Sequence, residues 1–364
     1  MFIEKVANQW VSLYNEFIIN NINLLDINEL SGNLNVKLDF ILTNSHIKWN
    51  MYKICRRADI TIDIVLLYPY IKWDISNLMT NKNITLDHIK NTPHLNWDMN
   101  RIYTNPNITY NDIVNNHNDN KLYMIDLSKN MNITLDIIKK YKLSVWNPAG
   151  LSCSAHITIE FVINNPQIKW SLTDLNRNSS LKVSDILKCN QIEINGYGLS
   201  QNKSLEMSDI LNYPHIKWDM YTVSKHPNIT FTDIIANPSV KWIMQSVCVN
   251  PNITMDIVYN NKQIPWNVEW LSGNINITIQ FISLYRSMIY YTDSLSQNPS
   301  ISFININEIN YINWNWYYIS RNTMNISKKK YIIDNVYKLN VICQTIKLTT
   351  ISECLIPIIM DYII

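Results

Sequence analysis

Apolar and polar residues recur along this chain with a period of 24 residues. The triplet Asn-Ile-Thr marks the period at residues 83–85, 107–109, 132–134, 228–230, 252–254 and 276–278. We number the positions of each repeat from the Ile of that triplet. Position 1 is then aliphatic throughout, at Val36, Ile60, Ile84, Ile108, Ile133, Ile157, Leu181, Leu205, Ile229, Ile253, Ile277, Ile301 and Ile326. Such self-similarity predicts stacked units, each of which buries its apolar face against its neighbours.

The first half of each repeat has the pattern of a short helix. Positions 3 and 6 are apolar and three residues apart, so they lie on one face of a helix. A Thr at position 2, as in Thr85 and Thr230, is a natural N-cap, and an acidic residue in the first turn suits the unpaired N–H groups there. This helix is expected to run for about eight residues and to end near Asn or Pro.

An extended link follows and ends at position 14, which is most often Trp. The nine tryptophans are Trp49, Trp73, Trp97, Trp146, Trp170, Trp218, Trp242, Trp266 and Trp314. Asn, Asp or Ser follows most of them and is a good N-cap for a second short helix, whose inner face carries positions 16 and 19. Asn at position 22 is expected to end that helix in the left-handed conformation of a C-cap. Positions 1, 3, 6, 12, 14, 16 and 19 are expected to be buried.

These elements predict an all-α fold, an α-solenoid (superhelix) of about thirteen two-helix repeats. We expect an N-terminal capping segment at 1–25, a helical repeat array at 26–340 and a C-terminal capping segment at 341–364. A β-solenoid like the leucine-rich-repeat horseshoe is the alternative. It needs a continuous alternating strand and a Gly-tolerant turn, whereas this chain has only 5 Gly and helix caps at the relevant places.

The recurring run Asn-Pro-Asn-Ile-Thr, followed by Asp-Ile-Ile or Asp-Ile-Val and then Ile-Lys-Trp-Asp-Met, covers residues 26–340. It resembles the Asn/Ile-rich tandem-repeat proteins of mimivirus-like giant DNA viruses. The unit is also similar to the leucine-rich variant repeat, most clearly at residues 105–109 and 250–254. The resemblance implies a viral protein with no catalytic residues, and an α-helix and a 3₁₀-helix per unit in a right-handed superhelix. No cysteines match those that hold an iron–sulfur cluster in the founding variant protein.

The composition of the chain limits which kinds of partner and which cellular compartment we expect for the protein. A formal net charge of +2 over 364 residues argues against a general nucleic-acid or membrane-surface binder. No apolar run is long enough for a membrane helix, and residues 1–5 lack the pattern of a signal peptide. The six cysteines have no metal-ligand spacing. We therefore expect no membrane association and a cytoplasmic location, which for a viral protein is the host cytoplasm or the virus factory.

Two sets of residues at fixed positions are candidates for function. The tryptophans offer stacking surfaces for bases, but Leu122 and Ile194 replace them in two units, which favours a structural core ladder. Lysines at position 13 form a stripe that suits phosphate tracking, although Glu193 and other residues interrupt it. We take this lysine stripe as the candidate binding face: Lys48, Lys72, Lys169, Lys217 and Lys241.

Catalytic chemistry finds no support in the sequence. The histidines of position 11, His46, His94 and His215, lie in different repeats and are too far apart to share a metal ion. No unit combines a nucleophile, a base and an orienting group, and no phosphate-binding Gly loop occurs. We expect a protein that is not an enzyme and has no catalytic, cofactor-binding or metal site. The favoured function is a repeat scaffold for interaction with a host or viral protein; the alternative is a nucleic-acid-binding helical-repeat protein that uses the lysine stripe.

Overall fold

The computed structural model describes residues 2–97, 105–107, 112, 134–140, 146–286 and 291–345. All regular secondary structure in these residues is helical, so the fold is all-α, as the sequence predicts. The chain divides into two compact units, which we describe separately. Unit 1 comprises the described parts of 1–54 and 253–364, and unit 2 those of 55–252.

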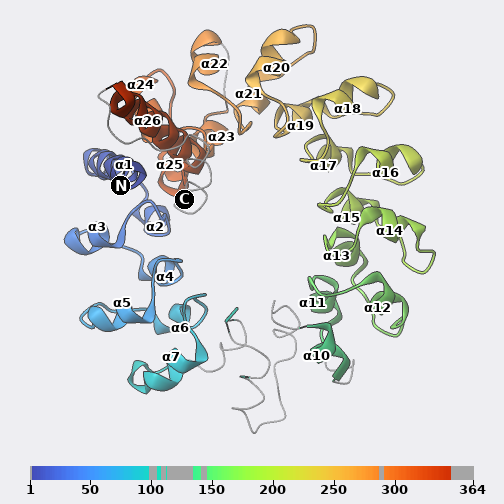
Figure 1. The fold of residues 1–364 in the computed structure, drawn as a ribbon, viewed down its shortest axis with the longest axis horizontal. Coiled ribbons are helices and arrows are strands. Elements are labelled where there is room, and N and C mark those ends of the chain that lie inside the picture. The colour runs from blue at the N-terminus through green and yellow to red at the C-terminus, as the bar shows by residue number, and fades with distance from the viewer. Residues whose placement is uncertain are drawn as a thin grey trace. The chain divides into compact units, whose positions relative to one another are not determined.

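Both units consist of short helices that begin at the same two repeat positions, 3 and 16. In unit 2 they are α5 (Ile62–Leu67), α6 (Ile75–Leu78), α7 (Leu86–Asn91), α10 (Leu135–Lys140), α11 (Pro148–Ser152), α12 (Ile159–Ile163), α13 (Leu172–Arg177), α14 (Val183–Lys188), α15 (Gly196–Ser200), α16 (Met207–Asn212), α17 (Met220–Ser224), α18 (Phe231–Ala236) and α19 (Met244–Cys248). A short 3₁₀-helix, η1 (Pro93–Leu95), lies in the link after α7. We call the helix that begins at position 3 the first helix of its repeat, and the helix that begins at position 16 the second helix. Neighbouring second helices stack on one another, α11 on α13, α13 on α15, α15 on α17 and α17 on α19 (Figure 1).

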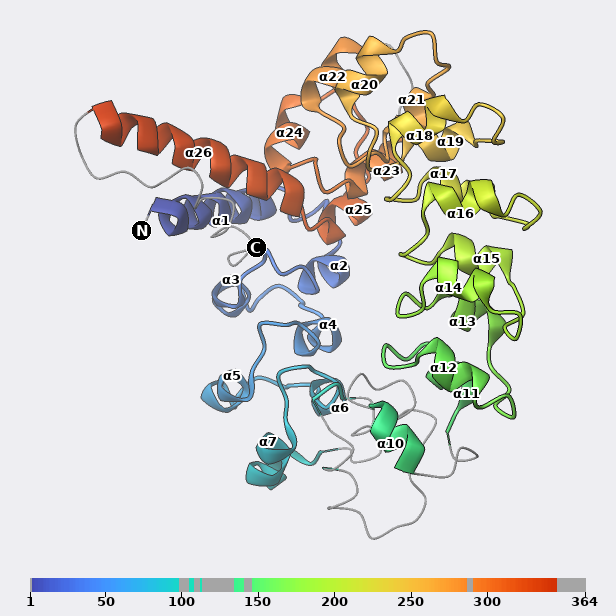
Figure 2. The same ribbon diagram turned by 45° about the vertical axis from the view of Figure 1, so that its right-hand side comes forward.

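Unit 1 has the same helix pairs and two longer helices. The pairs are formed by α2 (Ile27–Ser31), α3 (Leu38–Thr43), α4 (Met51–Cys55), α20 (Met255–Asn260), α21 (Val268–Leu271), α22 (Ile279–Leu284), α23 (Thr292–Gln297), α24 (Phe303–Glu308) and α25 (Trp316–Arg321). The long helices are α1 (Phe2–Asn20) and α26 (Asn325–Thr345), and they pack side by side (Figure 2). Thus α1 falls in the expected N-terminal segment, while α26 runs past the expected boundary at residue 340; residues 346–364 lie outside the described part.

The predicted N-caps are present at both helices of the repeat. Thr230 Oγ1 accepts the N–H of Asp233 at 3.2 Å, and the Asp233 carboxylate accepts the N–H of Thr230 at 2.8 Å, which completes a capping box. At a second helix, Asn195 Oδ1 accepts the N–H of Gly198 at 2.7 Å. The first helices are shorter than expected, six residues in α5 and α18, because the chain turns into the link directly after position 8.

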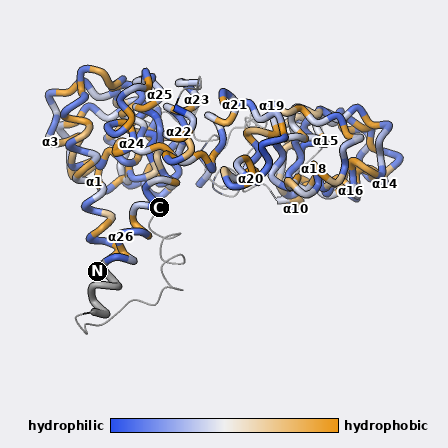
Figure 3. Tube along the Cα trace, turned by 90° about the horizontal axis from the view of Figure 1, so that it is seen from above, coloured by the Kyte–Doolittle hydropathy of each residue, from blue (hydrophilic) through white to orange (hydrophobic). Residues whose placement is uncertain are grey.

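Three repeat positions form the deepest part of the core. In the described repeats from Val36 to Ile301, position 1 is at most 3% exposed, and position 19, from Leu30 to Ile319, at most 1%. Position 6 is also buried. Positions 3, 12, 14 and 16 include half-buried residues such as Leu38, Ile47 and Met51, so the expected burial of these positions is incomplete. Hydrophobic and hydrophilic stretches alternate along the trace of both units (Figure 3).

The Asn of position 22 does not act as a left-handed C-cap, and the explanation drawn from the sequence was wrong. Asn178 has φ −66° and ψ 114°, and Asn322 has φ −65° and ψ 121°. Among the described non-Gly residues, only Asn96 and Met324 have positive φ. These asparagines are buried instead, because their side chains satisfy backbone groups between repeats.

Asn202 shows the bonding of position 22 in full. Its Nδ2 donates, each time at 3.0 Å, to the carbonyl oxygens of Asn176 and Asn178 in the preceding repeat and to that of Leu181 at position 1 of its own repeat. Its Oδ1 accepts the N–H of Ser204 at 3.0 Å. A buried amide that bonds to several backbone carbonyls on both sides of the repeat boundary fixes the spacing of adjacent repeats. Inter-repeat bonds of this kind recur at Asn33, Asn81, Asn105, Asn178, Asn250, Asn298 and Asn322.

Position 20 supplies a second inter-repeat bond through a small buried side chain. Ser200 Oγ accepts the N–H of Asp219, 19 residues further on, at 2.9 Å, and donates to Gly196 O at 2.7 Å. Cys55 takes the same place: its Sγ lies 3.3 Å from the N of Asp74. We call the bonds of positions 20 and 22 the inter-repeat ladder.

Candidate interaction face

The tryptophans of position 14 hold the link between the two helices of a repeat. In eight of the nine, the indole N–H donates to the backbone carbonyl five residues earlier, as in Trp218 to Tyr213 O at 3.1 Å and Trp242 to Asn237 O at 3.0 Å. Tyr213 and Asn237 are the C-caps of their first helices. The same bond is made by Trp49, Trp73, Trp97, Trp170, Trp266 and Trp314. For Trp146 the corresponding carbonyl lies outside the described residues.

These tryptophans are less buried than the expected core ladder requires. Trp146 and Trp314 are buried, at 3% and 7% exposure, while the other seven are half-buried. The bond to the end of the first helix is made by buried Trp314 and by half-buried Trp218 alike, so it does not depend on full burial of the ring. The tryptophans therefore fix the shape of each repeat, and the aliphatic residues of positions 1, 6 and 19 form its center.

All five lysines of the predicted stripe are exposed. Lys48 belongs to unit 1, and Lys72, Lys169, Lys217 and Lys241 belong to unit 2. Lys217 and Lys241 occupy adjacent repeats, whereas exposed Glu193 stands at the same position between Lys169 and Lys217. The carboxylate of Glu193 would repel the phosphates of a nucleic acid that ran along the lysine stripe.

The second helices carry a set of exposed tyrosines that was not predicted from the sequence. Position 17 is Tyr in four repeats, on α4, α15, α17 and α25, with exposures between 42% and 56%. They are Tyr52, Tyr197, Tyr221 and Tyr317. The signal in the sequence is a Tyr three residues after the Trp position, on the helix side opposite the buried position 19. Tyr is among the residues that most often anchor protein interfaces.

A cation lies one helical turn beyond three of these tyrosines, at position 21. The pairs are Tyr52 with Arg56, Tyr221 with Lys225 and Tyr317 with Arg321. Lys225 Nζ lies 4.1 Å from the centre of the Tyr221 ring, a cation–π contact. Within each unit, we call the surface formed by positions 17 and 21 the second-helix face.

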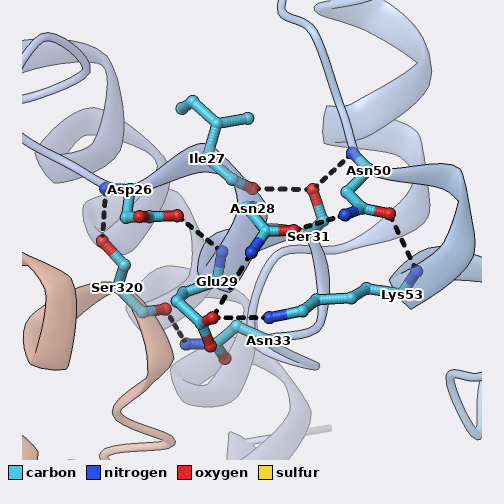
Figure 4. Close-up of polar contacts among 9 residues, drawn as sticks. All are labelled: Asp26, Ile27, Asn28, Glu29, Ser31, Asn33, Asn50, Lys53 and Ser320. Atoms are coloured by element: carbon cyan, nitrogen blue, oxygen red, sulfur yellow. Dashed lines mark hydrogen bonds and ion pairs between the residues drawn. The ribbon is translucent and has the colours of Figure 1, made fainter.

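Polar bonds between repeats order this face. Asn195 Nδ2 donates to Thr173 Oγ1 at 3.3 Å, and Asn315 Nδ2 donates to Asp293 Oδ1 at 2.7 Å, each joining position 15 to position 17 of the preceding repeat. Lys53 Nζ pairs with Glu29 Oε1 at 2.7 Å and links α4 to α2 (Figure 4). Side chains held in this way lose little freedom when a partner binds.

Buried titratable groups in the repeats are structural. Burial raises the pKa of the Cys55 thiol to about 11, so this cysteine is no nucleophile at neutral pH. Burial lowers the pKa of His226, which replaces Asn at position 22. In the part of the chain that the structure describes, no three His, Cys, Asp or Glu residues lie close enough to hold a metal ion.

Comparisons of the chain with protein-family models, curated proteins and solved structures find no match. Among the described helices, none combines the length and the apolar character that crossing a bilayer requires.

Proposed function

We propose that the protein is a non-catalytic α-solenoid scaffold that binds a protein partner through the second-helix face. The exposed Tyr of position 17, with a cation one turn further on, carries the proposal. Tyr and Arg dominate the binding energy of protein interfaces, because a rigid aromatic ring buries a large area at little entropic cost. Repetition on stacked helices provides the extended surface that repeat proteins use for recognition.

Variation between repeats supplies specificity. In unit 2 the position-17 residue is Thr173 on α13, Tyr197 on α15, Tyr221 on α17 and Gln245 on α19. One central aromatic pair is thus flanked by polar residues, which is the arrangement of hot spots inside a polar rim. The resemblance to giant-virus repeat proteins supports a viral protein that acts on a host or viral partner in the host cytoplasm or virus factory.

The test compares two double variants of unit 2 in capture from lysate of the producing cells. Tyr197→Ala with Tyr221→Ala removes the aromatic pair of the second-helix face. Leu211→Ala with Ile235→Ala removes two exposed apolar residues, at 48% and 55% exposure, from first helices of the same unit. We expect the tyrosine variant to lose a partner that wild type and the control variant both capture. Equal capture by all three proteins would contradict the proposal.

The alternative, nucleic-acid binding along the lysine stripe, keeps one supporting observation, the exposure of all five lysines. It predicts salt-sensitive retention on heparin that disappears when Lys48, Lys72, Lys169, Lys217 and Lys241 are replaced by Ala. We expect wild type and this variant to elute alike at physiological salt, because Glu193 breaks the stripe and the net charge is near zero. Tight polynucleotide binding that is lost with the lysines would favour the alternative.

A further inference from the structure

The two ends of the chain make the bonds of the inter-repeat ladder with each other. Asp26 N–H donates to Ser320 Oγ at 2.8 Å, as Asp219 N–H donates to Ser200 Oγ. Asn33 Nδ2 donates to Ser320 O at 3.1 Å (Figure 4). It also donates to Asn322 O at 2.9 Å, so both inter-repeat bonds of position 22 are present. A further inter-repeat bond, from position 24, is also repeated at the ends: Asn35 Nδ2 donates to Thr323 O, as Asn228 Nδ2 donates to Lys203 O.

The spacing of these bonds shows that the ends share one repeat frame. Within the array the four bonds span 19, 26, 24 and 25 residues. The corresponding four bonds between the two ends span 294, 287, 289 and 288 residues. For each of the four bonds, the span inside the array and the span between the ends add to 313 residues. Thirteen repeats of 24 residues account for all but one of the 313 residues. The remaining residue is the one by which the step from Ile108 to Ile133, at 25 residues, exceeds the usual 24.

One repeat is therefore composed of both ends of the chain. The helix α26 follows Asn322 where the first helix of the next repeat is due, and α2 stacks on α25 as α25 stacks on α23. The sequence places Ile326 at the buried position 1, but Ile326 is 39% exposed, whereas Met324, two residues earlier, is buried. We call α26 and α2, with the ladder bonds from Asp26 and Asn33 to Ser320 and Asn322, the joint.

Helix α1 reinforces the joint from one side. Ile3 and Val6 of α1 form an apolar cluster with Ile332 and Val336 of α26. Further along α1, the Trp10 ring lies 5.2 Å from Phe303 of α24, and the Phe17 ring lies 6.2 Å from Trp316 of α25. The two end helices have 19 and 21 residues, against four to six in the ordinary pairs of unit 1, such as α21 and α22. Their length adds contact area where no peptide bond connects the halves of the repeat.

The joint also contains an uncompensated charge. Lys328 is 8% exposed; its Nζ lies 3.2 Å from Asn35 Oδ1 and 4.9 Å from the centre of the Trp10 ring. Burial, together with repulsion from Lys37, lowers the pKa of Lys328 to about 8. In the described residues no carboxylate lies within ion-pair distance of this amine. A buried charge without a counter-ion destabilises the contact that holds it.

We infer that the joint is a clasp, which opens and closes as a unit while the other repeats stay folded. Among the described repeats, it is the one whose two helices come from distant parts of the sequence. Because no short chain segment connects these helices, only non-covalent contacts have to break for the joint to open. Opening separates α25 from α2 and so divides the second-helix face between Tyr317 and Tyr52; this consequence rests on the proposed function, whereas the clasp itself does not.

Hydrogen exchange of the full-length protein tests the clasp without a partner. Asn33→Ala removes the position-22 bonds of the joint, and Asn202→Ala removes the position-22 bonds of one repeat inside unit 2. In the Asn33 variant we expect amides of α1, α2 and α26 to exchange about tenfold faster, and those of α14–α18 to change by less than about twofold. The Asn202 variant should accelerate exchange in α14–α18.

A second matched pair covers the case in which an Asn variant fails to fold. Ser320→Ala removes the acceptor of the Asp26 N–H in the joint, and Ser200→Ala removes the acceptor of the Asp219 N–H in unit 2. The clasp is supported if the Ser320 variant speeds exchange in α1, α2 and α26 alone. It is overturned if exchange in these helices equals that of wild type, or if it rises together with exchange throughout unit 2.

Discussion

At the scale of single residues, side-chain hydrogen bonds to the backbone decide which residue the repeat requires. Trp218 is half-buried, yet its indole N–H satisfies Tyr213 O, so it contributes both packing and a hydrogen bond. Trp218→Ala should lower the free energy of unfolding by about 3 kcal/mol, the lower end for a large aromatic. Trp218→Phe keeps the ring and loses the bond, and should cost about 1 kcal/mol. Urea unfolding measures both; equal losses would show that packing contributes nothing beyond the bond.

His226 should make stability depend on pH. Its Nδ1 accepts the N–H of Asn228 at 3.2 Å and its Nε2 pairs with Asn202 O at 3.1 Å, so the neutral ring reproduces the bonding of Asn. Burial lowers its pKa below the ordinary value of about 6.5. The unfolded state therefore takes up the proton first, and the stability present above that value decreases as pH falls through it.

The variant His226→Asn should remove this sensitivity, because the amide makes the same bonds at every pH. We expect its urea midpoint to change less than that of wild type between pH 7 and pH 5. His215→Asn, at an exposed site, serves as the control and should behave as wild type. If both variants keep the full pH dependence of wild type, His226 is not its source.

At the scale of elements, the starts of the helices were predictable and the bonds between repeats were not. Caps and apolar spacing act within a few residues, so Thr230 and Asn195 mark helix starts in the sequence itself. The role of Asn202 depends on carbonyls that lie 21 to 26 residues away, and Asn suits a C-cap equally well on local grounds. Tyr221 became recognisable as a surface residue only after the helix orientation was known, since Tyr is common in this chain.

The close stacking of α15 on α13 gives a prediction for this scale. A Cβ on Gly198 would lie 2.7 Å from Thr173 O, whereas the nearest atom to a Cβ on Gly32 is 3.5 Å away. Gly198→Ala should therefore destabilise the protein by about 1–3 kcal/mol, because helix backbones must move apart. Gly32→Ala should be neutral or stabilise by up to about 1 kcal/mol. Thermal melting compares them; equal melting temperatures would contradict the tight contact.

At the scale of the whole molecule, the ladder explains why a chain of very short helices folds. Helices of four to six residues are unstable alone, so each depends on stacking against its neighbours. The joint extends this dependence to the two ends, which the sequence could not indicate, because repeat frames near residues 30 and 320 look independent when read along the chain. Within unit 2, the same stacking places Tyr197 on α15 beside Tyr221 on the next second helix, α17.

Site-specific photo-cross-linking tests the central claim, that a protein partner binds the second-helix face. A photoreactive phenylalanine would replace Tyr221 on α17 in one protein and Ile235 on the neighbouring first helix α18 in another, both exposed positions of unit 2. In lysate of the producing cells, the account predicts a discrete cross-linked protein at residue 221 that is absent at residue 235 and is competed by unlabelled wild type. The same cross-linked species at both positions, or cross-links only at residue 235, would contradict it.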